Sequence, residues 1–282
     1  MSDRTQTTDA MRWMLLVAAV LVTVIGAPLF LLPDKTAFLF SWTVNPPVTA
    51  AFLGGAYLAA GLVEFRASQD TTWESARIAV PAVWIFTTMT LIATLLHIDK
   101  FHFGAEFAPF TQFVTWVWLA VYGLVPIVMG ALWVLQLRKT SKDGPRANPM
   151  AGWMRTVLWG QAGILLLLGG GLFLAPADIK FLWPWALSAL TARAVGAWLI
   201  GIGALSAHMA LEGDNQRVAH ANAALIVFCV LEVLAVIRLS ADTSAAGDPV
   251  IDWGDARIWL FIAALGAMLG TAIAGWRARA HG

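Results

Sequence analysis

Two charged side chains lie inside apolar stretches that are long enough to cross a membrane. Arg193 stands a few residues into the stretch 190–211, and Glu232 stands about six residues before the outer end of the stretch 218–237. Consecutive stretches cross a bilayer in opposite directions, so both charges are expected at a similar depth. A lone carboxylate in hydrocarbon is costly. We therefore predict an Arg193–Glu232 ion pair, which is either a structural link between two helices or a substrate or proton site.

A second group of polar residues follows the third apolar stretch. His97, Asp99, His102 and Glu106 lie within ten residues, and Asp99, His102 and Glu106 would share one face if a helix continued there. Imidazole and carboxylate groups together could hold a divalent metal such as zinc. The spacing is not a specific metal signature, and it suits a hydrated loop as well. We predict no cofactor, and a divalent metal on these four residues is the less favoured alternative.

Glu64 stands near the end of the second apolar stretch and His208 near the other end of the stretch 190–211, both on the side of the membrane that also carries the two termini. Long polar side chains near the end of a membrane helix commonly reach the interface. We expect Glu64 and His208 to do so or to form hydrogen bonds there, and a proton-relay role is the alternative. Gly266 and Gly270 form a GxxxG pattern in the last stretch. This pattern favours close helix packing, which we expect within the chain rather than in a homodimer.

The elements that must position these residues are membrane helices. The chain has 282 residues, of which 59% are hydrophobic and only 12% charged, and its mean hydropathy is +0.73. Apolar runs of roughly 20 residues match the thickness of a bilayer when they are helical. We predict an all-α, polytopic bundle of about eight transmembrane helices. The expected spans are Met11–Leu32, Pro47–Phe65, Ala76–Leu96, Phe113–Leu137, Met154–Leu174, Leu190–Leu211, Val218–Ile237 and Ile258–Trp276.

The two halves of the sequence resemble each other. Residues 26–33 read GAPLFLLP and residues 169–176 read GGGLFLAP, and a tryptophan follows nine residues after each final proline, at Trp42 and Trp185. This pattern predicts two tandem four-helix repeats, 1–140 and 154–282, joined by a cytoplasmic linker at 141–153. An even number of spans in each repeat gives both the same orientation.

Basic residues predict the orientation. Of the 18 lysines and arginines, twelve fall on the side of the termini and the linker and six on the opposite side. The positive-inside rule then places both termini in the cytoplasm, and we assign the chain to a bacterial cytoplasmic membrane. The first stretch is too long for the core of a signal peptide, so we expect it to be retained. The aromatic segments 35–42 and 178–185 are expected at the membrane interface, with a lid as the alternative.

Sequence motifs do not identify a reaction. The chain carries no Walker loop, dinucleotide fingerprint, zinc-protease helix or nucleophile elbow, so an enzyme is the least favoured class. The net charge of +1 gives no sign of nucleic-acid binding. The expected partners are the lipid bilayer and either another membrane protein or a second copy of the chain. Three hypotheses remain: a transporter of a small solute or lipid with its path between the repeats, a non-catalytic scaffold or accessory subunit, and a metal- or cofactor-binding redox subunit.

Overall fold

A computed structural model describes residues 5–139, 143–243 and 247–281 of the chain. Within these residues, eight helical segments are long and apolar enough to cross a membrane. They are α1 (Asp9–Leu31), α3 (Pro47–Gln69), α5 (Val80–Leu96) together with the short α4 (Trp73–Ala76) before it, α6 (Pro109–Leu137), α7 (Gly152–Leu174), α9 (Ala189–Glu212), α10 (Ala219–Arg238) and α11 (Ala256–Ala278). The predicted all-α, multi-pass membrane protein with about eight spans is confirmed.

Local sequence signals set several of the helix ends. The side chain of Thr8 accepts a hydrogen bond from the Met11 amide at the start of α1, and Ser188 caps α9 in the same way. Pro47 occupies the first position of α3, where its missing N–H costs no helical hydrogen bond. At the end of α9, Gly213 adopts a left-handed conformation with φ of 56°, which terminates the helix.

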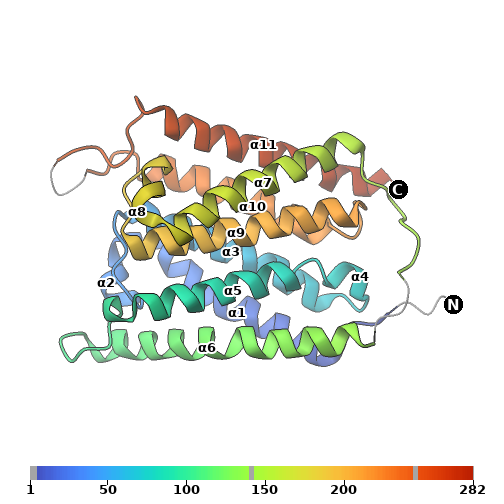
Figure 1. Cartoon of the computed structure of the whole chain (residues 1–282), viewed down its shortest axis with the longest axis horizontal. Helices are drawn as coiled ribbons and strands as arrows, with labels where there is room; N and C mark the ends of the chain where they lie inside the picture. The colour runs from blue at the N-terminus through green and yellow to red at the C-terminus, as the bar shows by residue number, and fades with distance from the viewer. Residues whose placement is uncertain (1–4, 140–142, 244–246, 282) are drawn as a thin grey trace.

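The long helices run side by side along the long axis of the molecule (Figure 1). The short helices α2 (Thr36–Leu39) and α8 (Pro176–Ile179) lie at one end, which we call the α2/α8 end. Both ends of the chain and α4 lie at the opposite end, which we call the linker end because residues 143–151 connect the two halves there.

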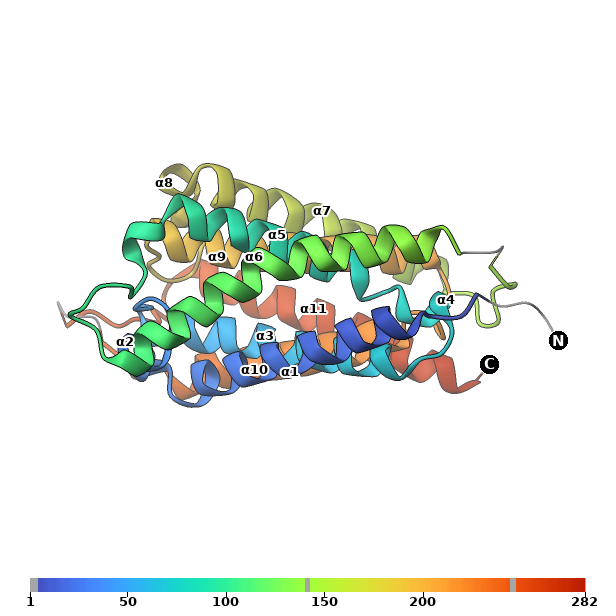
Figure 2. The same ribbon diagram turned by 90° about the horizontal axis from the view of Figure 1, so that it is seen from below.

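Helices α3 and α9 form the centre of the bundle. In their most apolar stretches, 78% of the residues of α3 and 72% of those of α9 are buried, against 22% for α6. Helix α1 packs on α3, and α7 packs on α9. The third long helix of each half crosses to the other half, because α5 packs on α9 and α10 packs on α3. Seen from below, α1 and α6 lie on one face of the bundle (Figure 2).

Glycines allow two of these helix pairs to approach backbone to backbone. A Cβ atom at Gly54 would lie 2.4 Å from the Phe30 nitrogen of α1, and one at Gly196 would lie 2.7 Å from the Gly169 oxygen of α7. Close backbone approach of this kind favours association of helices in lipid. The α1–α3 and α7–α9 pairs therefore depend on small residues.

The expected packing of Gly266 and Gly270 within the chain is wrong. A Cβ atom at either position would meet nothing within 4 Å. Helix α11 turns Leu265, Met268 and Ala272 toward the core instead. On a helix these three residues share one face, and the two glycines lie on the other.

The aromatic segments 35–42 and 178–185, which precede α3 and α9, were expected to place their indole rings at the membrane interface. This expectation is wrong. Trp42, Trp183 and Trp185 are no more than 4% exposed. Trp42 packs edge-on against Trp118 of α6 with ring centroids 5.1 Å apart, and Trp185 packs in the same manner against Phe261 of α11 at 5.5 Å. Each segment folds back into the α2/α8 end of the bundle, so its rings fill space between helices.

Candidate functional site

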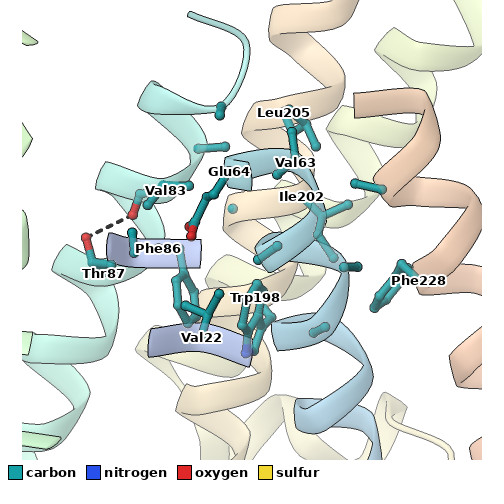
Figure 3. Close-up of a pocket in the computed structure, with 18 of the residues that line it drawn as sticks. Val22, Val63, Glu64, Val83, Phe86, Thr87, Trp198, Ile202, Leu205 and Phe228 are labelled. Atoms are coloured by element: carbon teal, nitrogen blue, oxygen red, sulfur yellow. Dashed lines mark hydrogen bonds between the residues drawn. The ribbon is translucent and has the colours of Figure 1, made fainter. Parts of the chain in front are cut away.

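A cavity of about 80 Å³ lies within the bundle, between the two halves of the chain. Helices α1, α3, α5 and α6 of the first half and α9 and α10 of the second half contribute its walls. Most of the lining side chains are apolar, as Figure 3 shows for Val22, Phe86 and Ile202. Glu64, Thr87 and Tyr122 add polar groups. The cavity is thus an apolar space with a few polar atoms on its wall.

Glu64 is the acidic residue of this cavity. Its side chain extends from α3 toward α5 (Figure 3). The residue is 1% exposed, and its Oε2 atom is buried without a hydrogen-bond partner. The nearby Thr87 hydroxyl donates to the Val83 carbonyl oxygen of its own helix at 2.9 Å, so it does not serve the carboxyl group. The expectation that Glu64 reaches the interface is wrong, because its side chain is buried at the cavity wall and α3 continues past it to Gln69.

Two tyrosine hydroxyl groups lie beside the cavity. Tyr122 of α6 lines it, and the Tyr122 hydroxyl forms a hydrogen bond of 2.5 Å with the Tyr57 hydroxyl of α3. Both residues are 2% exposed. These are the two tyrosines of the chain, and they are brought together from positions 65 residues apart. They supply donor and acceptor groups in an otherwise apolar region.

A second pocket, which we call the chamber, lies at the linker end and has a volume of about 400 Å³. Arg77 lies between two carboxylates at its wall. The Arg77 Nε atom donates to Glu212 Oε1 at 2.6 Å, and its two terminal nitrogens donate to the Asp143 oxygens at 2.8 and 2.7 Å. A paired, two-bond geometry of this kind is among the stronger charged interactions in proteins. It joins the segment between α4 and α5, the end of α9 and the linker.

Arg217 binds the linker to the same wall. It donates to the Gly144 carbonyl oxygen at 2.6 Å and forms an ion pair with Glu74 at 3.3 Å. The Gly144 amide in turn donates to Glu74 at 2.5 Å. Arg146 adds a hydrogen bond of 2.8 Å to the Glu212 carbonyl oxygen. The described part of the linker therefore contributes to the wall of the chamber and is held there through both side-chain and backbone contacts.

The chamber and the cavity lie next to each other along the bundle. On α9, Leu205 lines the cavity, and His208 lines the chamber. Three residues of α-helix correspond to about 4.5 Å along the axis. His208 bonds to Glu212 through Nε2 at 3.2 Å, which fits the expected hydrogen bonding near the end of the span. On α5, Ala82 lines the cavity and the adjacent Pro81 lines the chamber.

The predicted ion pair between Arg193 and Glu232 is wrong. Arg193 Nη1 forms a hydrogen bond of 2.7 Å with His97 Nε2. Glu232 is 1% exposed, and its Oε1 atom has no hydrogen-bond partner. The reason lies in the packing of the helices: α9 packs on α5 and α7, whereas α10 packs on α3 and α11. The two residues stand on consecutive helices but face different neighbours.

The four residues considered for a metal have separate partners. His97 faces Arg193. His102 uses both ring nitrogens, toward the Thr43 hydroxyl and the Phe40 carbonyl oxygen, at 3.1 Å each. Asp99 pairs with Lys100 at 2.9 Å, and this hydrogen bond lowers the pKa of Asp99. The Glu106 carboxyl folds against Gly104. Across the described residues, no three His, Cys, Asp or Glu side chains form a group that could hold a metal ion.

Several residues of the cavity and the chamber were not singled out from the sequence. Tyr57 and Tyr122 are polar groups inside apolar stretches, and this signal was available in the sequence. Arg77, Glu74 and Glu212 lie at the ends of spans, where charged residues are ordinary. Only their convergence with the linker marks them. No protein-family model, curated protein or solved structure matches the chain.

Proposed function

We propose that the chain is a transporter of a small solute or a lipid, with its path between the two halves. The observation that carries this proposal is the Glu64 carboxyl group, which is buried without a partner for Oε2 in a cavity walled by helices of both halves. Ionisable groups inside the membrane are costly and usually serve a function. A transport path gives this group a role that packing alone does not.

We also propose that the two halves are tandem repeats of the same orientation, 1–140 and 154–282. Matched contacts support this interpretation. The Gly26–Gly54 contact of α1 with α3 corresponds to the Gly169–Gly196 contact of α7 with α9. Ligand sites commonly lie at the interface of such repeats, and the cavity lies at that interface.

The proposed path leads from the linker end through the chamber to the cavity. We place the linker end in the cytoplasm of a bacterium because most of the basic residues lie on that side. Toward the α2/α8 end, the rings of Phe40, Trp42 and Trp118, which pack at a tilt or edge-on, close the first half. The apolar wall with few polar groups suits either a weakly polar solute of a few non-hydrogen atoms or one end of a lipid.

Flux measurements in proteoliposomes test this proposal. Swelling in glycerol reports the movement of a small solute, and the flip of a fluorescent phosphatidylglycerol reports the movement of a lipid. We expect the wild-type protein to support one of the two. Glu64→Gln, which removes the ionisable group, and Ala82→Trp, which fills the cavity, should each lower that flux about tenfold.

Gly266→Ala is the matched control, because a Cβ atom at this position meets nothing within 4 Å. Its flux should equal that of the wild type. If folded wild-type protein moves neither compound, the transport proposal fails and the accessory-subunit alternative is preferred. If both cavity variants transport normally, the path does not run past Glu64.

A further inference from the structure

Glu232 is a second buried carboxyl group, and it stands at a different level of the bundle from Glu64. Its Oε1 atom has no hydrogen-bond partner and lies 2.6 Å from the point where Gly55 of α3 would carry a Cβ atom. Any side chain at position 55 would therefore collide with the carboxyl group. The space that Glu232 occupies exists because residue 55 is glycine.

The two carboxyl groups are linked through the packing of α3 and α10. On α10, Leu225 and Phe228 line the cavity of Glu64, and Glu232 follows Phe228 by four residues, on the same face of the helix. On α3, Gly55 and Glu64 are nine residues apart, or about 14 Å along the helix axis. Glu64 thus lies toward the linker end and Glu232 toward the α2/α8 end of the same pair of helices.

The surroundings of both groups are uncharged. Among the described residues neither carboxyl group forms an ion pair, and Glu64 Oε2 and Glu232 Oε1 are buried without a hydrogen-bond partner. The titratable neighbours are Tyr122, which lines the same cavity as Glu64, and Cys229, which lies three residues before Glu232 on α10. A carboxylate without a counter-charge is expensive in such a medium, so the group takes up a proton and becomes neutral. Each site therefore favours the neutral acid.

We propose that Glu64 and Glu232 are two proton-binding sites and that the proton is the coupling ion of the transporter. This inference rests on the transport function proposed above. Each site binds one proton from water to form a carboxylic acid and releases it again, with no other bond made or broken. The hydrogen-bonded hydroxyl groups of Tyr122 and Tyr57 lie beside the Glu64 cavity. Tyr57 is two residues from Gly55 on α3 and so faces the other side of that helix, which makes the two acids separate sites.

Dicyclohexylcarbodiimide tests the proposal in native membranes, independently of any transport assay. This apolar reagent enters lipid and reacts with protonated carboxyl groups. At neutral pH we expect adducts on the peptides that contain Glu64 and Glu232, detected by mass spectrometry. Glu64→Gln and Glu232→Gln should each lose one adduct and keep the other. Absence of both adducts, or labelling of these residues only by a water-soluble carbodiimide, would overturn the assignment.

Proton movement is measured separately with a pH-sensitive dye inside proteoliposomes. Solute or lipid flux should be accompanied by a change in internal pH, and Glu232→Gln should abolish that change. Flux without any pH change would refute proton coupling and leave the transport function intact. Absence of all flux together with normal carbodiimide labelling would refute the transport function, while the two proton-binding sites would stand.

Discussion

Arg193 is a charged side chain near the end of a membrane helix whose hydrogen-bond partner is an imidazole and not a carboxylate. Its guanidinium group can only donate, so the His97 Nε2 atom, 2.7 Å away, must accept. His97 is then neutral and carries its proton on Nδ1. Burial and the charge of Arg193 hold the pKa of His97 below its ordinary value of 6.5. The contact requires the uncharged ring.

This contact predicts the pH dependence of stability. The pKa of His97 is lower in the folded protein than in the unfolded chain, so the unfolded chain binds more protons as the pH falls below about 6.5. Acidification to about pH 5 should therefore lower the thermal unfolding temperature of the detergent-solubilised protein. Burial lowers the pKa of His102 too, so His102 acts in the same direction.

His97→Gln is the informative variant, because a glutamine oxygen can accept from Arg193 and does not titrate. It should show a smaller loss of thermal stability on acidification than the wild type. An identical pH dependence in the two proteins would show that the His97–Arg193 contact does not govern this response.

At the scale of helices, the pairs α1–α3 and α7–α9 owe their closeness to glycine. Gly54 faces the α1 backbone near Phe30, and Gly196 faces the α7 backbone near Phe173. Lipid tails and leucine side chains are equally apolar, so burial gives little reason for two membrane helices to associate. Contact area and close backbone approach decide which helices pair. Helix pairs with glycine at the contact can pack at shorter distance than the others.

Gly196→Ala should destabilise the bundle by about 1–3 kcal/mol, the usual cost of overpacking. A Cβ atom at this position would lie 2.7 Å from the Gly169 oxygen and 3.0 Å from the Phe173 nitrogen, and backbone atoms cannot rotate away. Unfolding in mixed micelles with increasing dodecyl sulfate measures the effect. Gly163→Ala is the control, since its Cβ atom would meet nothing within 4 Å and alanine favours the helix. Equal stability of the two variants would contradict the prediction.

For the whole molecule, the crossing of α5 and α10, the third long helix of each half, to the opposite half has the largest consequence for the two pockets. Because α5 packs on α9 and α10 packs on α3, neither half encloses its own core. The Glu64 cavity and the chamber both take residues from the two halves. Relative movement of the halves would therefore change both pockets at once.

The orientation proposed for the molecule can be tested with single cysteines. Cys229 is the sole cysteine of the chain, so Cys229→Ala gives a cysteine-free protein. In intact cells, Glu106→Cys should react with a membrane-impermeant maleimide, and Gln69→Cys should react only after the cells are opened, because the basic linker end faces the cytoplasm. Both positions are near the ends of spans. The reverse pattern would invert the proposed topology.

Span positions were predictable from the sequence because they follow from one length scale. The bilayer sets the length of an apolar helix, and the predicted 218–237 differs by one residue from α10, Ala219–Arg238. The start of α6 at Pro109 was placed four residues late. The predicted span began late because Phe110 and Gln112 do not clearly extend the apolar run. The better signal was Pro109, since proline is favoured at the first position of a helix.

The sequence by itself determined the all-α class, the number of spans and the presence of Glu64 and Glu232 inside them. Only the tertiary structure decided which helices meet, and with them the partner of Arg193, the cavity around Glu64 and the open face of Gly266. The physical reason is that lipid-facing and core-facing sides of a membrane helix are both apolar. Periodicity therefore cannot tell them apart, and the choice of neighbours depends on backbone shape and on polar contacts between distant segments.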